Sequence, residues 1–253
     1  MVSPQKRSTD YFDGWYANKK AAPAVGEIMN RHMSLPPGLL AGAVPAEAIP
    51  EIAAGLRLGP ADLLVDLACG RGAYGLEITA RTGARLIGVD FSAEAVRQAR
   101  EQASRLGRDD AEFRVGDLTA SGLPPASADA VLCTDSVQFP DQPAEAFQEI
   151  RRVLRPGGRV ALTGWEAIDR ADERLSVKRR QADFGASLAA AGFTDIEVRD
   201  RPAWRERERA MWEEAAALDP GDDPALRSFH DEGVSVLSTF SLVRRILATA
   251  TAP

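Results

Sequence analysis

The residues best suited to chemistry are an acid and three glycines that follow an apolar run. Asp66 comes near the end of the run, and glycines follow at positions 70, 72 and 75. Glycine lets the backbone turn sharply and approach a ligand, while the free N–H groups of a helix start favour an electron-rich group. The spacing Gly70-x-Gly72-x-x-Gly75 would fit NAD, FAD or another adenosine ligand. Asp66 adds a carboxylate that can meet a cationic ligand.

Alternating strands and helices must position these residues. Apolar runs and turn signals predict strands at 62–67, up to 90, 111–115, 129–133, 159–164, around 196–198 and at 243–250. Helical spacing predicts helices at 45–58, 72–81, 92–107, 143–154, 184–191, 204–218 and 224–239. The last apolar segment could also continue the preceding helix, and we choose a strand. The alternation implies a mainly parallel sheet that is covered on both faces.

Four motifs in this order resemble those of the class I S-adenosylmethionine (SAM)-dependent methyltransferases. They are Asp66-x-x-Cys69-Gly70-x-Gly72, the segment 86–92, Gly116-Asp117-Leu118 and the segment 154–158. The resemblance covers roughly residues 60 to 165, whereas the chain ends match loosely. It implies an α/β, Rossmann-like class I methyltransferase fold, with a mainly parallel seven-stranded sheet, helices on both faces and a helical cap.

The resemblance also assigns roles in binding the cofactor SAM, which would leave as S-adenosylhomocysteine (SAH). The turn at Gly70 would hold the methionine part, with Asp66 near its ammonium. Asp90, 20 residues after Gly70, would accept hydrogen bonds from both ribose hydroxyls, and Phe91 would lie against the adenine. Asp117 would accept from the adenine amine. The complete set is Asp66, Ala68, Cys69, Gly70, Arg71, Gly72, Asp90, Phe91, Gly116, Asp117, Leu118 and Thr134, with Tyr11 and Tyr16 from the N-terminal segment.

Two departures from the family pattern affect these expectations. Ala68 and Arg71 stand where glycine and a small hydroxyl residue are common, so the rim of the turn is bulkier and more basic, and Arg71 could touch the donor carboxylate. The segment 134–139 lacks the Asn-Pro-Pro-Tyr type of sequence with which relatives methylate amino groups of bases and glutamine. We therefore do not expect methylation of nucleic-acid amines.

An aromatic cluster near the N-terminus has two readings. Tyr11, Phe12, Trp15 and Tyr16 fall at helical spacing, so that a short helix would group their rings along one side. The helix could be a staple on the domain or a lid over cofactor and substrate, and both readings can hold together. The expected division is 1–58 as a helical cap, 59–201 as the SAM-binding core, 202–242 as a helical insertion in the cap and 243–253 as the final strand.

A catalytic base, needed if the acceptor is a hydroxyl, must come from a short set of residues. His32 and His230 are the only histidines, and an unperturbed histidine can take a proton near neutral pH. Asp135 could serve instead of His32, or the reaction could proceed by positioning alone. Trp165 and Glu166, after the fifth strand, are candidate pocket wall.

Composition narrows the classes of partner. The 253 residues are 45% hydrophobic, with a formal charge of −6 and a pI near 5.2. This balance argues against a broad phosphate-binding face, so we expect a small-molecule acceptor and no nucleic acid. The absence of an apolar run of membrane length or a signal core predicts no membrane partner and a cytoplasmic location.

The sequence leaves the oligomeric state open, and a homodimer is possible. Two cysteines and two histidines offer no metal-ligand spacing, so we expect free buried thiols and no metal.

These observations lead to one functional prediction with two rivals. We expect a SAM-dependent methyltransferase that acts on a small apolar or aromatic metabolite, with O- or C-methylation preferred to N-methylation. The first rival is a SAM-binding protein of the same fold without methyl transfer. The second is a nicotinamide-dependent oxidoreductase, against which Asp66 and the Asp117 motif argue.

Overall fold

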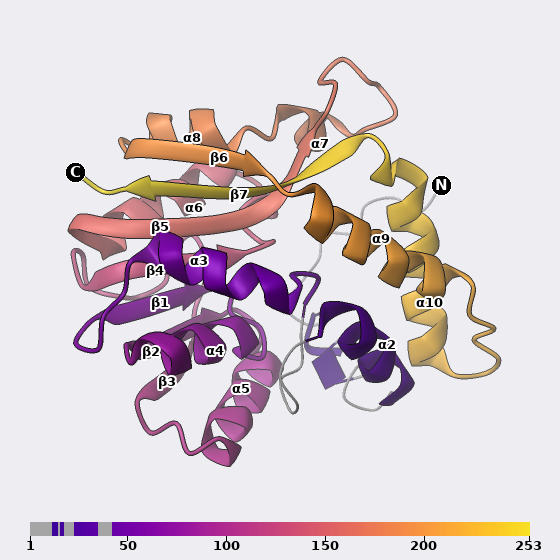
Figure 1. Ribbon diagram of the computed structural model, residues 1–253, viewed down its shortest axis with the longest axis horizontal. Helices are drawn as coiled ribbons and strands as arrows, with labels where there is room; N and C mark the ends of the chain where they lie inside the picture. The colour runs from indigo at the N-terminus through magenta and orange to yellow at the C-terminus, as the bar shows by residue number, and fades with distance from the viewer. Residues whose placement is uncertain (1–11, 15, 18–22, 35–41) are drawn as a thin grey trace.

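The computed structural model describes residues 12–14, 16–17, 23–34 and 42–253, and its centre is a seven-stranded sheet (Figure 1). In spatial order the strands are β3 (Ala111–Val115), β2 (Arg85–Asp90), β1 (Leu63–Leu67), β4 (Ala128–Thr134), β5 (Leu154–Ala167), β7 (Val243–Thr251) and β6 (Thr194–Asp200). Strands β1 to β5 pair in parallel, whereas β7 runs antiparallel to both β5 and β6. The predicted mainly parallel sheet is confirmed, and the last apolar segment is a strand.

Helices cover both faces of the sheet, as the alternation predicts. One layer holds α3 (Ile49–Leu56), α4 (Ala73–Thr82) and α5 (Ala93–Arg105), and the other holds α6 (Pro143–Val153) and α8 (Phe184–Ala190). Successive side chains of a strand point to opposite faces. Leu64 of β1 accordingly packs in the cluster of the first layer, and Val65 packs in the cluster of the second. Burial on both faces explains why the central strands read as continuous apolar runs.

A helical cap lies beside the sheet edge formed by the carboxyl ends of the parallel strands. It consists of α2 (Pro23–Met33), α9 (Pro202–Ala216) and α10 (Pro224–Phe240), which gather at one end of the molecule in Figure 1. Gly233 lets α9 and α10 approach closely, since a Cβ there would lie 3.0 Å from the carbonyl oxygen of Trp212. The Trp212 and Phe229 rings pack at 5.5 Å between centroids. These two helices follow β6 and precede β7 in the chain.

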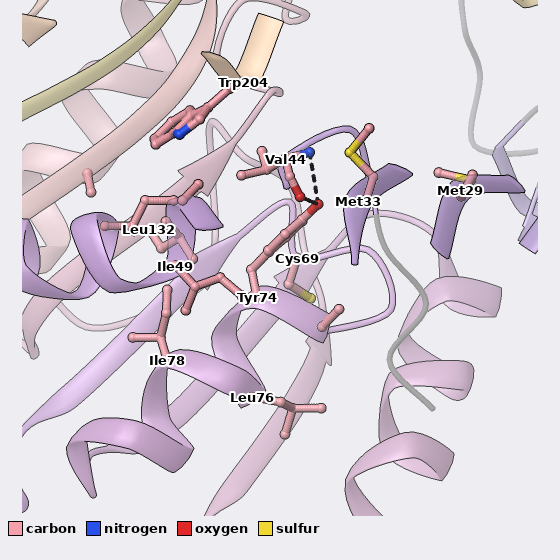
Figure 2. Packing of buried hydrophobic residues seen from close by; sticks show 14 of the residues in the cluster. Met29, Met33, Val44, Ile49, Cys69, Tyr74, Leu76, Ile78, Leu132 and Trp204 are labelled. Carbon is pink, nitrogen blue, oxygen red and sulfur yellow. Dashed lines mark hydrogen bonds between the residues drawn. The ribbon is translucent and has the colours of Figure 1, made fainter. Parts of the chain in front are cut away.

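The cap and the sheet layer share one buried cluster. The Tyr74 hydroxyl of α4 accepts from Val44 N at 3.0 Å and donates to Val44 O at 2.9 Å, and Figure 2 shows this bond in the cluster that also holds Met33 and Trp204. The short helix η1 (Ala46–Ala48) then leads into α3, which lies on the sheet: a Cβ at Gly55 would be 2.8 Å from Thr249 Cγ2. The sequence 1–58, predicted to be cap throughout, therefore also supplies a helix of the sheet layer.

Candidate active site

The turn after β1 has the backbone form that its glycines predict. Gly70 and Gly72 have φ of 54° and 78°, in the left-handed region that favours glycine. A Cβ at Gly72 would lie 2.6 Å from Phe113 Cε1, so no larger residue fits there. Ala68 also has a positive φ, 56°, which costs about 1–2 kcal/mol for a residue with a Cβ. The turn therefore holds backbone strain at the position where the family commonly has glycine.

Asp66 is buried below this turn and is only partly satisfied. Its carboxyl group accepts a hydrogen bond from the backbone of Gly75, but Oδ1 has no hydrogen-bond partner among the described residues. Burial, with a smaller contribution from the charge of Asp90, raises the pKa of Asp66 to about 8. An unpartnered buried carboxyl oxygen is costly, and an ammonium group would both satisfy it and favour its ionised form.

Asp90, at the end of β2, holds the turn in place. Its Oδ2 accepts from Gly70 N at 2.8 Å, and its Oδ1 accepts from Ser92 N at 2.9 Å. Burial raises the pKa of Asp90, while these backbone hydrogen bonds oppose the shift. Each carboxylate oxygen has two acceptor positions, so the group can still receive hydroxyl donors from a ligand.

The described part of the N-terminal segment folds over this region. Asp13 accepts from the Ser92 hydroxyl and from Glu94 N at 3.2 Å, at the start of α5. The Phe12 ring packs edge to face against the Phe91 ring, with 5.1 Å between the ring centroids. The Tyr16 hydroxyl oxygen lies 2.8 Å from the position of a Cβ on Gly70. Tyr11 and Trp15, the other members of the predicted aromatic cluster, lie outside the described residues.

A cavity of about 440 Å³ extends from the glycine turn to the cap. Of the residues predicted for the cofactor, it is lined by Tyr16, Ala68, Cys69, Gly70, Arg71 and Thr134. Burial lowers the pKa of the Arg71 guanidinium at its rim. Trp165, predicted as pocket wall, lines the cavity together with Trp212 and Phe240 of the cap. The cavity therefore joins the turn to an aromatic chamber.

A buried arginine links the chamber to the sheet. Arg245 of β7 is fully buried, with Nη2 at 2.7 Å from Asp135 Oδ2 and Nη1 at 3.4 Å from Glu208 Oε2. Its guanidinium lies over the Trp165 ring at 4.2 Å. Asp135 also accepts from Thr163 Oγ1 at 2.6 Å, and it has a φ of 57°. Asp135, predicted as an alternative base, lines the cavity, but its carboxylate is paired with an arginine, which weakens the case for it as a base.

Glu208 and Arg245 are residues that the sequence interpretation missed. Glu208 falls within the helix predicted at 204–218 and received no role there, whereas the structure buries it at 2% exposure on the wall of the cavity. The signal was present, because Glu208 lies four residues from both Trp204 and Trp212 and so shares their apolar stripe. Arg245 gave no comparable local signal, since its partners come from distant parts of the chain.

The structure does not bring the two histidines to the cavity. His32 Nε2 lies 2.6 Å from Glu214 Oε2, an ion-pair geometry that links α2 to α9, and His230 Nδ1 lies 2.9 Å from Asp231 Oδ1. Neither histidine is among the described residues that line the cavity. The prediction of His32 as a catalytic base is therefore corrected: its sequence pattern did not reveal that Glu214 would be its partner.

The third-strand motif also lies away from the cavity. Asp117 Oδ1 accepts from Thr119 N at 2.7 Å and from Thr119 Oγ1 at 2.6 Å, a local turn at the exposed end of β3. Gly116 and Leu118 do not line the cavity either, within the part of the chain that the structure describes. The adenine role of Asp117 stays a prediction, and its present hydrogen bonds stabilise the turn.

Two further expectations concern thiols and metals. Cys69 and Cys133 are free and buried, as predicted. Across 12–14, 16–17, 23–34 and 42–253, no group of three or more His, Cys, Asp or Glu residues is placed to hold a metal ion. In the same ranges, no helix has the length and apolar character needed to cross a membrane.

Comparisons with known proteins agree with this geometry. Residues 65–162 match the family model described as a methyltransferase domain. Nocamycin O-methyltransferase of Saccharothrix syringae is 36% identical over 167 residues, which cover 53% of this chain and 59% of that protein. The chain spans from 32% to 59% of the length of the curated relatives that it matches first.

Solved structures share the fold. Phosphoethanolamine N-methyltransferase 2 of Haemonchus contortus, in complex with SAM, is similar with a TM-score of 0.74 at 20% identity, over 98% of this chain and 59% of that one. The [4+2]-cyclase SpnF is similar with a TM-score of 0.70 at 21% identity, over 82% of this chain and 80% of that one. A methyltransferase and a cyclase both have this fold, so the activity has to be argued from the residues of the site.

Proposed function

We propose that the chain is a class I SAM-dependent methyltransferase that transfers the methyl group of SAM to a small apolar or aromatic acceptor, which the match of residues 65–162 to a methyltransferase domain supports. The observation that carries the proposal is the buried Oδ1 of Asp66 beside the glycine turn, for which the described part of the chain offers no hydrogen-bond partner. The ammonium group of SAM can pair with Oδ1 of Asp66, and the ribose hydroxyls of SAM can donate hydrogen bonds to the carboxylate of Asp90. A nicotinamide dinucleotide has no aliphatic ammonium for Asp66.

The described residues have separate tasks in this proposal. SAM supplies an activated methyl group on a sulfonium. The turn at Gly70 and Gly72 gives the cofactor close access to the backbone, and Asp66 and Asp90 hold its ammonium and ribose. Phe12 and Tyr16 cover the turn from the N-terminal side. A covered site keeps competing water away and holds donor and nucleophile together, which is what a displacement reaction requires.

The aromatic chamber supports a small, ring-bearing acceptor. Trp165 of β5, Met211 and Trp212 of α9 and Phe240 of α10 line it. Aromatic and apolar side chains of this kind bind the apolar surface of a ligand and orient its rings. We infer O- or C-methylation, because the segment after β4 lacks the Asn-Pro-Pro-Tyr type of sequence with which relatives methylate amino groups of bases and glutamine. The similarity to an O-methyltransferase over 167 residues supports the same choice.

Calorimetry with SAM and NAD tests the proposal directly. We expect SAM to bind and NAD not to bind. Asp90→Ala should weaken SAM binding by about 10- to 100-fold, because losing charge-assisted hydrogen bonds costs about 1.5–3 kcal/mol. Asp109→Ala, at an exposed position outside the site, is the matched control. Unchanged SAM affinity in a folded Asp90→Ala variant would remove Asp90 from the site.

Product mass distinguishes methyl transfer from binding alone. SAM with a panel of small aromatic acceptors should give products heavier by one methylene unit, together with SAH. Tight SAM binding without product or SAH formation across the panel would favour the SAM-binding rival. NAD binding in place of SAM would favour the oxidoreductase.

A further inference from the structure

Glu208 is a buried acid in the acceptor chamber that the cofactor roles leave unexplained. It comes from α9, and its carboxylate faces three donors from three elements. Trp212 Nε1 donates to Oε1 at 3.2 Å, and Trp165 Nε1 donates to Oε2 at 3.2 Å. Arg245 Nη1 lies 3.4 Å from the same Oε2. All three distances are long for charge-assisted hydrogen bonds, which are about 2.7–2.9 Å.

The acceptor capacity of Glu208 is not exhausted by these contacts. A carboxylate offers about four lone-pair positions, two on each oxygen. Among the described residues, Oε2 faces two donors, from Trp165 and Arg245, whereas Oε1 faces one, the indole of Trp212. One position on Oε1 therefore stays open to a hydroxyl donor. Because Glu208 lines the cavity, that donor can belong to a bound acceptor molecule.

The charges around Glu208 also leave it available as a proton acceptor. The groups that face it are the guanidinium of Arg245 and the carboxylate of Asp135, which together with Glu208 make one positive and two negative charges. Asp135 has the closer contact with Arg245, at 2.7 Å against 3.4 Å. Burial and the nearby charge of Asp135 raise the pKa of Glu208, while Arg245 and the two indoles oppose the shift. A carboxylate with a raised pKa is a stronger base than a surface carboxylate.

We infer that Glu208 is the catalytic base for a phenol- or enol-type hydroxyl, so that the reaction is an O-methylation. This inference rests on the proposed function. The acceptor O–H bond breaks and its proton goes to the Glu208 carboxylate. The acceptor oxygen forms a bond to the methyl carbon as the bond from that carbon to the sulfonium sulfur breaks. The products are a methyl ether, SAH and neutral Glu208, so atoms and charges balance.

The walls around Glu208 fit an acceptor of this class. Trp165 and Trp212 carry both indole donors and ring faces, so they orient the carboxylate while packing against an aromatic acceptor. Phe240 lines the same chamber. A flat aromatic acceptor with one hydroxyl can pack its ring against these side chains while its hydroxyl donates a hydrogen bond to Oε1 of Glu208.

The test compares Glu208→Gln with Glu206→Gln, an exposed position on the same helix. The probes are 4-methoxyphenol, which is neutral near pH 8, and 4-nitrophenol, which is largely ionised there. With 4-methoxyphenol, kcat of Glu208→Gln should fall by about 100-fold or more, the usual contribution of a positioned base. With ionised 4-nitrophenol, which needs no base, the loss should be below about tenfold, and SAM affinity should stay at the parent value in both variants.

Binding of 4-nitrophenol in the presence of SAH gives a readout without turnover. The parent protein should bind the neutral phenol, whose hydroxyl donates to Glu208. Glu208→Gln should bind the yellow phenolate, because the new amide can donate. A merely structural role for Glu208 would not reverse this spectrum. If Glu208→Gln does not fold, Glu208→Asp keeps the carboxylate and should retain the preference for the neutral phenol.

Three results would overturn the inference. One is an unchanged rate of Glu208→Gln with 4-methoxyphenol. Another is an equal loss with both phenols, which would indicate a disturbed structure instead of a missing base. The third is a parent protein that binds SAM but neither binds nor methylates any phenol; this outcome would leave SAM binding standing and refute the acceptor class alone.

Discussion

Asp66 makes the stability of the protein depend on pH. Burial raises the pKa of Asp66 to about 8 in the folded protein, against an ordinary value of 3.8. A group with a raised folded pKa stabilises the fold fully below its unfolded pKa, and the contribution is lost as pH rises through the folded value. Without cofactor, the midpoint of thermal unfolding should therefore fall as the pH rises from about 4 to about 8 and level off above that.

Asp66→Asn tests this assignment. The variant should show a flatter dependence of the midpoint on pH and, above about pH 8, a higher midpoint than the parent. The same variant should bind SAM more weakly, because an amide cannot neutralise an ammonium. Calorimetry in buffers of different ionisation enthalpy should detect a proton released when SAM binds the parent near neutral pH. An unchanged pH dependence in Asp66→Asn would assign the titration to another group.

Ala68 is the position where the turn stores strain. Ala68→Gly should stabilise the protein by up to about 1 kcal/mol, because relief of a strained positive φ outweighs the entropy that glycine loses on folding. Ala80→Gly, at an exposed site inside α4, is the control and should destabilise by about 0.5–1 kcal/mol. Denaturant unfolding measures both. Equal destabilisation by the two substitutions would show that Ala68 is unstrained.

Single residues were predictable where their signal is local. Asp66, Gly72 and Asp90 lie next to strand ends, so their positions follow from a few neighbouring residues. Arg245 is 110 residues from Asp135 and 37 from Glu208, and no short pattern shows that β7 will bring them together. The contact between His32 and Glu214 could not be predicted for the same reason, because the two residues are 182 positions apart in the sequence.

The N-terminal segment is the element whose removal should affect turnover most. Deleting residues 1–20 removes the contacts of Phe12, Asp13 and Tyr16 with the cofactor region, while the sheet and its helices stay complete. We expect a folded protein with weaker SAM binding and at least about tenfold less methyl transfer, equivalent to about 1.4 kcal/mol of transition-state positioning.

A shorter deletion is the matched control for this prediction. Removing residues 1–10 keeps Phe12, Asp13 and Tyr16, so most of the activity should remain. Methyl transfer by each variant, with thermal unfolding as the check on folding, measures the difference. Near-normal turnover after deletion of residues 1–20 would reduce the aromatic cluster to a staple on the outside of the domain.

Elements were predicted well where one face is apolar, and less well where tertiary pairing sets their length. The predicted third strand agrees with β3, Ala111–Val115, because turn residues bound it on both sides. The fifth strand was predicted at 159–164, but β5 begins at Leu154, which pairs with Ala128 of β4, and continues to Ala167, since antiparallel pairing with β7 runs from Arg159 to Ala167. Its sequence alone does not reveal this pairing.

Metal dependence is a property of the complete enzyme, and we expect none. The loop after β4 offers Asp135, which already pairs with Arg245, and the described ranges hold no cluster of three acidic, histidine or cysteine ligands. EDTA should therefore leave methyl transfer unchanged. Activity that is lost in EDTA and restored by magnesium would mean that ligands come from elsewhere in the chain.

The insertion of β7 between β5 and β6 fixes an order in which the site can appear during synthesis. The glycine turn, Asp66 and Asp90 leave the ribosome more than 150 residues before Arg245, so the cofactor half can form while the acceptor half still lacks its arginine. Until β7 is made, β5 and β6 have no strand between them, and Asp135 and Glu208 have no shared cation. A chain that stops before residue 243 should therefore accumulate as an aggregation-prone species with unpaired strand edges.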